Sequence, residues 1–175
     1  MKKTSNQFLD FLIRYGLLII VAIPNFWLFY LIFTPLTVGV TNFFLNMFYG
    51  TVLLENSIKI TADLSIEIIE ACVAGSAYYL LFILNLSLRK LDLKKRVKMI
   101  LSSFIALFLV NTLRIIIFSV LAVEKVSWFD FAHKLFWYIG SIVLVILIWF
   151  AEVKFFKIKQ IPFVEDIKFL YKKRK

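Results

Sequence analysis

Long apolar runs are the feature that most constrains what this chain can fold into. Four runs have the roughly 17 to 25 helical residues needed to cross a bilayer core, and they cover residues 11–33, 72–88, 99–123 and 131–151. Pro24 and Asn25 interrupt the first run, a break that membrane helices tolerate. Hydrophobic residues make up 62% of the chain, well above the roughly 45–50% of soluble domains. The sequence therefore predicts an all-α, polytopic membrane bundle of about four transmembrane helices.

The apolar runs belong to one unit. No linker-like stretch or internal repeat divides the chain, so we expect a single integral membrane domain over residues 1–175. The first run is too long for the core of a signal peptide and lacks a small-residue cleavage site, which predicts an uncleaved span. The lysine-rich residues 152–175 predict a basic cytoplasmic tail.

Basic residues predict the orientation of the spans. They concentrate in the loop after the second run and in the tail: Arg89, Lys90, Lys94, Lys95, Arg96, Lys98, Lys154, Lys157, Lys159 and residues 172–175. Because lysine and arginine accumulate on the cytoplasmic side, this loop and both termini should be cytoplasmic. Residues 55–70 and 124–130 carry more acidic than basic side chains and should lie outside. The net charge of +10 thus marks topology, and we expect no nucleic-acid partner.

Residues 35–54 are apolar but do not fit as another crossing. A fifth passage would place either the N-terminal lysines or the acidic stretch on the wrong side of the membrane. We therefore predict a helix lying in the external interface, within an external interfacial segment that covers residues 35–70. Inside it, "SIKITADLSIEII" alternates apolar and polar residues in part, which predicts a short extended or hairpin structure.

This topology brings three reactive side chains toward the outer face. Cys72, the only cysteine, begins the second span, and His133, the only histidine, begins the fourth, both at their outer ends. Arg114 lies on the third span, roughly 12 to 15 Å before that helix emerges at 1.5 Å per residue. Ionisable residues within a membrane face the bundle interior, a partner or water, and they usually serve function.

Each of these residues also has a purely structural explanation. A cysteine can pack as a small hydrophobic residue, His133 can be an interfacial polar residue, and Arg114 can pair with Glu70 or another external acid. Their conjunction favours function, because three separate spans deliver them to one pocket. A thiolate of Cys72 can attack a carbonyl, His133 can move the proton, and Arg114 can stabilise the oxyanion. The set predicts an acyl-transfer site.

Neighbours of the cysteine fit this site, although ordinary bundle packing explains them equally well. Gly75, Ser76 and Tyr79 would share a helical face with Cys72, and the small pair leaves room for a visiting helix.

Residues on the other spans can likewise either support the site or serve only in bundle packing. Asn111, one turn before Arg114, can hold the guanidinium. Gly140 and Ser141 form a small patch on the fourth span, and Asp130 can cap that helix or orient the imidazole.

These residues resemble the exosortase and archaeosortase family of membrane transpeptidases over roughly residues 50–150. The resemblance rests on "EACVAGS" with Glu70, Cys72 and Gly75, on "NTLRI" with Asn111 and Arg114, and on "AHKLFWYIGS" with His133 and Gly140. The family commonly has glycine two residues after the cysteine, where this chain has Ala74.

The resemblance implies a membrane cysteine transpeptidase in the cell membrane of a bacterium or archaeon. Its substrates would be envelope proteins that end in a sorting signal, made of a short motif, a transmembrane helix and a basic cluster. Cys72 would cleave at the motif through a thioester, and an amine acceptor, expected to be a lipid, would resolve it.

Two alternatives stay open at this point. Water can resolve the thioester, which would make the protein a plain membrane cysteine protease. The chain can also be a non-catalytic transporter or assembly subunit with Arg114 as an intramembrane charge. One histidine with scattered acids cannot supply the ligands usual at catalytic zinc, and no phosphate-binding glycine loop occurs, so we expect no metal and no cofactor.

Overall fold

The computed structural model describes residues 2–23, 26–61, 63–88, 91–159, 161–163 and 167. Its helices are α1 (Lys2–Ala22), α2 (Trp27–Tyr49), α3 (Glu70–Val73), α4 (Gly75–Leu86), α5 (Leu93–Val123), α6 (Phe129–Leu135), the π-helical turn η1 (Phe136–Gly140) and α7 (Ser141–Phe155). Strands β1 (Val52–Leu54), β2 (Ser57–Lys59) and β3 (Ser65–Glu67) form an antiparallel sheet in the order β1-β2-β3. The predictions at Pro24, Asn25, Arg89, Lys90 and residues 172–175 lie outside the described residues.

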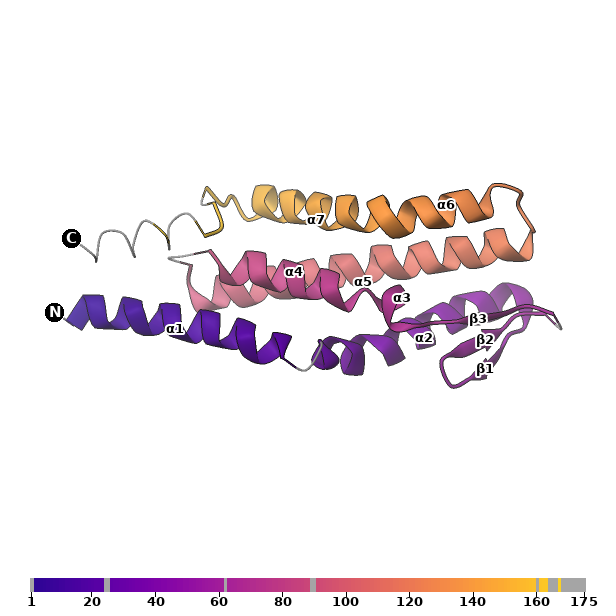
Figure 1. Cartoon of the computed structure of the whole chain (residues 1–175), viewed down its shortest axis with the longest axis horizontal. Coiled ribbons are helices and arrows are strands. Elements are labelled where there is room, and N and C mark those ends of the chain that lie inside the picture. The colour runs from indigo at the N-terminus through magenta and orange to yellow at the C-terminus, as the bar shows by residue number, and fades with distance from the viewer. Residues whose placement is uncertain are drawn as a thin grey trace.

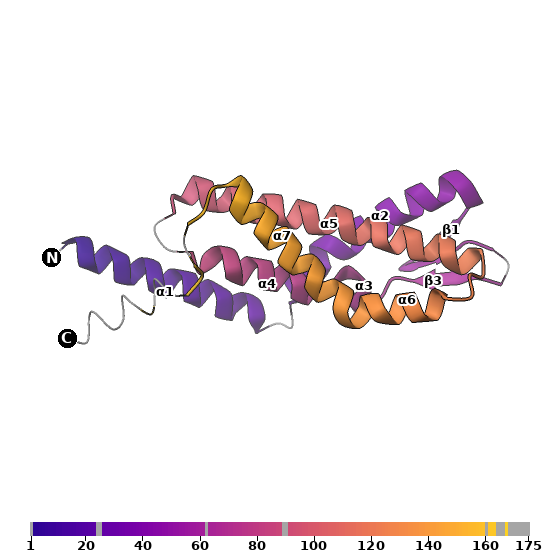
Figure 2. The ribbon, with the colours of Figure 1, turned by 90° about the horizontal axis from the view of Figure 1, so that it is seen from above.

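The helices run along one long axis (Figure 1). α1 and α2 follow each other end to end, α4 returns beside them, and α5 and then α6 with α7 run the length of the bundle (Figures 1 and 2). α1 and α5 begin and α7 finishes toward one end, which we call the basic end because the start of α5 and the last turn of α7 carry lysines and arginine. The sheet and the turn between α5 and α6 lie at the opposite end, which we call the acidic end because the acids of residues 55–70 and 124–130 lie there.

Within the described residues, three helices are long and apolar enough to cross a membrane: Trp27–Tyr49, Leu93–Val123 and the continuous stretch Phe129–Phe155. Their outward faces carry large apolar side chains, such as Leu101, Ile105 and Leu109 of α5, which are more than half exposed. Such contiguous exposed apolar surface is what a lipid environment accommodates. The prediction of a helical membrane protein is therefore confirmed.

The predicted boundaries of the first span and of the external helix are wrong. Residues 11–33 do not form one helix, because α1 ends at Ala22 and α2 begins at Trp27. Residues 35–49 are not a separate helix either, since they continue α2 through Pro35. Membrane helices tolerate an internal proline because neighbouring structure satisfies the freed backbone groups. Thr37, Thr41 and Leu45 of this stretch are buried, so α2 is an integral part of the bundle.

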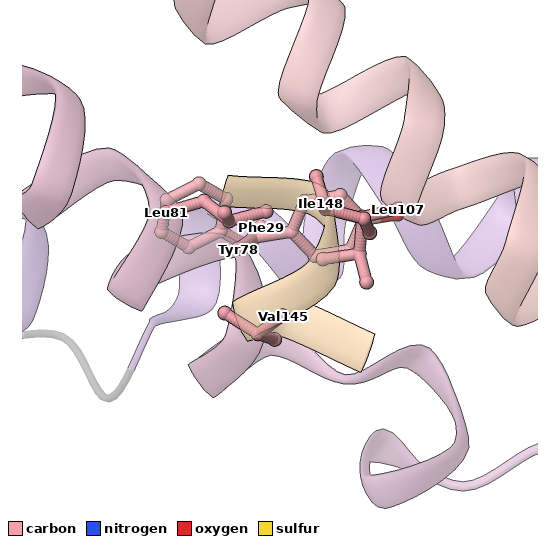
Figure 3. Close-up of a cluster of buried hydrophobic side chains, with 6 residues drawn as sticks. All are labelled: Phe29, Tyr78, Leu81, Leu107, Val145 and Ile148. Atoms are coloured by element: carbon pink, nitrogen blue, oxygen red, sulfur yellow. The ribbon is translucent and has the colours of Figure 1, made fainter. Parts of the chain in front are cut away.

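Aromatic packing holds the centre of the bundle together. Phe29, Tyr78, Leu81, Leu107, Val145 and Ile148 form a buried cluster to which α2, α4, α5 and α7 all contribute (Figure 3). The ring of Phe33 stacks on Tyr78 with centroids 3.8 Å apart, and Phe104 meets the Tyr78 ring edge-on at 5.4 Å. Because polar groups are scarce here, van der Waals packing fixes the relative positions of these helices.

A second cluster seats the sheet on the bundle. Ile58, Ile60 and Ile68 are buried together with Val38 and Leu45 of α2. Alternate residues of a strand point to opposite faces, so the isoleucines at 58, 60, 66 and 68 face the bundle and the polar residues between them face outward. The predicted hairpin is thus confirmed as the antiparallel pair β2–β3.

The basic end holds a group of buried polar side chains that we call the Asn85 cluster. Asn85 of α4 donates hydrogen bonds from Nδ2 to Glu152 Oε2 at 3.1 Å and to Ser103 Oγ at 3.4 Å. All three side chains are buried, and they join α4, α5 and α7. Two arginines cap the end of α4, since Arg14 donates to the carbonyl of Leu86 at 2.9 Å and Arg96 to that of Leu88 at 2.8 Å.

Candidate active site

A cavity of about 360 Å³ opens at the acidic end of the bundle. Cys72, Arg114 and His133 all line it, together with β3 and the aromatic residues of α5, α6 and η1. The three side chains come from α3, α5 and α6, which lie far apart in the sequence. The structure therefore brings the three predicted catalytic residues to one cavity.

The backbone around Cys72 is a short helical turn and not the start of a long helix. Its amide donates to the carbonyl of Ile69 at 2.8 Å, and the half-buried thiol borders the cavity. Ala74 ends α3 in the left-handed region with φ of +63°, a conformation that costs any residue except glycine about a kcal/mol or more. The predicted continuous helix over residues 72–88 is thus wrong, because this residue separates α3 from α4.

The break at Ala74 also overturns the predicted helical face around Cys72. Gly75 is buried, and a Cβ there would lie 2.6 Å from the Tyr30 ring of α2. The small patch is therefore already filled by α2 and cannot receive a visiting helix. Ser76 is exposed, and the Tyr79 hydroxyl donates to the carbonyl of Leu18 at 3.0 Å.

Asn111 holds the cysteine segment and not the arginine. Its buried side chain donates from Nδ2 to the carbonyl of Cys72 at 2.7 Å. This bond ties α3 to α5 at the backbone of Cys72 itself. A buried amide–carbonyl bond of this kind fixes the backbone because breaking it would leave two polar groups unsatisfied.

Arg114 is fixed from the other side of the cavity. Its Nη1 donates to Ser141 Oγ at 3.1 Å, and that hydroxyl donates to the carbonyl of Phe136 at 3.2 Å. Within the described part of the chain this bond uses only part of the guanidinium's donor fork, which leaves other N–H groups for a molecule in the cavity. Among the described residues, no ion pair joins Arg114 to Glu70.

The acceptor for Arg114 depends on the π-helical turn η1. Ser141 reaches the carbonyl five residues back, as in a π-helix. Gly140 makes room for the turn, because a Cβ there would lie 2.6 Å from the Phe136 ring. The predicted small patch of Gly140 and Ser141 thus packs within its own helix and supports the arginine.

Aromatic rings position His133. The Phe129 ring lies parallel to the imidazole at 5.6 Å, and the rings of Phe118 and Trp137 meet it edge-on at 5.4 and 6.1 Å. Asp130 is exposed in the first turn of α6, whose cap position is Trp128. Asp130 is therefore not the cap that we predicted, and the aromatic contacts orient the imidazole.

Two parts of the site, Glu67 and the extended backbone beside it, were not predicted from the sequence. Glu70 is exposed at the start of α3 and is absent from the cavity lining, whereas Glu67 of β3 contributes to it. Leu64 to Glu67 and Ile69 line one side of the cavity, in a segment that we had predicted only to lie over the outer face. The alternation of apolar and polar residues in this segment was the pattern from which extended backbone at the site could have been predicted.

This arrangement combines the elements of covalent acyl transfer. A thiol, an imidazole and a guanidinium border one space, and the cation favours the anionic species that form during attack on a carbonyl. Apolar side chains make up most of the remaining lining, including Ile115, Phe118 and Phe136, and they limit the access of water. No family model, curated protein or solved structure matches the chain.

Proposed function

We propose that this protein is a membrane cysteine transpeptidase that removes C-terminal sorting signals from envelope proteins. The observation that carries the proposal is the convergence of Cys72, Arg114 and His133 on one cavity at the acidic end of the bundle. The left-handed backbone at Ala74 adds support, because the similar family commonly has glycine there and glycine adopts this conformation without strain.

In this proposal the chain crosses the cell membrane of a prokaryote four times, with both termini in the cytoplasm. The passages are α1 with α2, α3 with α4, α5, and α6 with α7. The separation of a basic end from an acidic end supports this orientation by the positive-inside rule. The cavity would then open at the outer face, where the motif of a membrane-anchored substrate would arrive.

The chemistry assigns one role to each residue. The thiolate of Cys72 attacks the scissile carbonyl and forms a C–S bond, while Arg114 donates hydrogen bonds to the oxyanion. The C–N bond breaks as His133 gives a proton to the leaving amine, which releases the C-terminal helix. The acceptor amine then loses a proton to His133 and attacks the thioester, and the C–S bond breaks to restore the Cys72 thiolate and the protonated His133 of the starting state.

Intact-mass measurement of a reporter tests this function. The reporter ends in the motif, apolar helix and basic cluster of an envelope protein from the same genome, and it is expressed with wild type or with Cys72→Ala. We expect wild type to shorten the reporter and Cys72→Ala to leave it whole, because no other cysteine exists in the chain. Equal shortening by a correctly inserted Cys72→Ala protein would exclude Cys72 as the nucleophile.

The same spectrum identifies the second half of the reaction. An added mass at the new C-terminus indicates transfer to an amine, whereas a free carboxylate indicates a plain protease. If wild type shortens none of the tails from its own genome, the non-catalytic alternative replaces this proposal.

A further inference from the structure

The edge strand β3 borders the cavity with its free side. In the sheet order β1-β2-β3, its single partner strand among the residues that the structure describes is β2. Four consecutive residues, Leu64 to Glu67, line the cavity. Because successive side chains of a strand point to opposite faces, such a run can border one cavity only if the cavity lies along the strand's edge. The edge therefore presents backbone groups to the site.

The register identifies these backbone groups. The amide of Ile60 donates to the carbonyl of Leu64 at 3.0 Å, and the amide of Ile68 donates to that of Asn56 at 2.9 Å. Hydrogen-bonded positions alternate along an antiparallel pair, so even-numbered residues of β3 point their backbone groups toward β2. Ser65 and Glu67 consequently direct their N–H and C=O groups to the free edge.

We propose that the substrate segment on the N-terminal side of the scissile bond binds as an added strand on this edge. The inference rests on the proposed function, and its occupant is the extended peptide that precedes the transmembrane helix of the substrate. Strand addition provides main-chain hydrogen bonds for affinity and side-chain positions for specificity. It would also cover an edge that otherwise invites unwanted pairing.

The direction of the added strand follows from the chain directions. β3 runs from the tip of the acidic end toward Cys72 (Figure 1). In the proposed orientation the substrate also runs from its outer domain toward the membrane, so the two strands are parallel. In a parallel pair one residue bonds both neighbours of its opposite residue. The peptide residue opposite Ile66 would therefore donate to the carbonyl of Ser65 and accept from the amide of Glu67.

This geometry predicts an alternating motif. The peptide side chain beside Ile66 lies on the same face as Ile66, which packs against the apolar cluster under the sheet. The side chains before and after it lie on the face of Ser65 and Glu67, which are exposed. A short motif with an apolar residue between two polar ones fits this edge.

Proline substitution on the two edges of the sheet tests the inference. Glu67→Pro removes the amide that the substrate would use but no bond to β2, and an edge strand tolerates such a change. Leu53→Pro is the matched control, because Leu53 points its backbone to the opposite free edge at β1. We expect Glu67→Pro to slow shortening of the reporter roughly tenfold or more and Leu53→Pro to match wild type. An equal loss in Glu67→Ala, which keeps the amide, would overturn the proposal.

Hydrogen exchange gives a readout that does not depend on turnover. Cys72→Ala protein is compared with and without the bound reporter, and residues 64–69 should exchange more slowly when the reporter is present. Unchanged exchange in this segment would overturn strand addition even if Glu67→Pro failed to fold. If Cys72→Ala abolishes shortening but Glu67→Pro does not slow it, the proposed function stands and only this inference fails.

Discussion

The two ends of the bundle use polar residues in different ways. At the basic end, the side chains of the Asn85 cluster bond to one another and are buried. At the acidic end, Cys72 is half-buried and His133 is exposed, and with Arg114 they border an open cavity. α5 contributes to both groups, and the two groups differ in what their side chains face.

At the basic end polar side chains tie helices together, whereas at the acidic end they stay available for chemistry. The buried side chains of the Asn85 cluster bond to one another, although Asn85 Oδ1 and Glu152 Oε1 have no hydrogen-bond partner within the described residues. Breaking the cluster would leave further unpaired atoms in an apolar surrounding. At the acidic end the hydrogen bonds hold a backbone or one part of a side chain and leave the reactive atoms available. Asn111 holds the backbone of Cys72, and Ser141 holds one side of the Arg114 fork. Substitutions should therefore change stability at one end and rate at the other.

Arg114 should show the largest effect on rate. Removing one oxyanion donor typically costs about 10²- to 10³-fold, and we expect Arg114→Ala to slow reporter shortening by that amount. Arg114→Lys keeps the charge but lacks the planar fork, so it should recover only part of the rate. Pulse-chase measurement of reporter mass checks both. If Arg114→Lys shortens the reporter at the wild-type rate, a fork-shaped contact is not required.

Asn85 should show the opposite pattern. Asn85→Ala leaves Glu152 and Ser103 without their shared partner, and we expect a loss of about 1–3 kcal/mol of stability. The rate of reporter shortening by the folded protein should stay near wild type. Thermal unfolding in detergent measures the first quantity, and Ser76→Ala, at an exposed site on the same helix, is the control. A variant that melts normally but loses activity would remove the distinction between the two ends.

Ser141 should give the smallest effect and sharpen the account of the cavity. Ser141→Ala removes the acceptor that holds Nη1 of Arg114 but keeps every group that would touch substrate. We expect a several-fold loss of rate, consistent with one hydrogen bond worth about 0.5–1.5 kcal/mol. Ser141→Thr, which restores a hydroxyl, should regain most of it. A loss as large as that of Arg114→Ala would place Ser141 itself among the catalytic residues.

The convergence of the three reactive residues follows from long-range rules that a sequence displays. Basic and acidic segments set the direction of each passage, and helix rise sets the depth of Arg114. Neither rule depends on exact helix boundaries. Cys72 and His133 therefore reach the same end of the bundle although three of the predicted boundaries were wrong.

The local details depend on packing that the sequence does not display. The break at Ala74 has no glycine to mark it, and the position of Tyr30 against Gly75 requires knowledge of how α2 crosses α4. Asn111 lies within reach of both Arg114 and Cys72, and only the folded arrangement selects the carbonyl of Cys72. The number of crossings that the charges allow suggested a boundary at Pro35 that α2 does not have.

The π-helical turn η1 affects how the sequence of this helix can change without loss of the bundle. An α-helix rotates by about 100° per residue, so one inserted residue turns everything before it relative to everything after it. His133 lies before the turn, and the core residues Val145 and Ile148 lie after it. A gain or loss of one residue here can re-aim the histidine while the buried half of the helix keeps its packing. Insertions and deletions of this kind, more than substitutions, are the steps by which the geometry of such a site would be tuned.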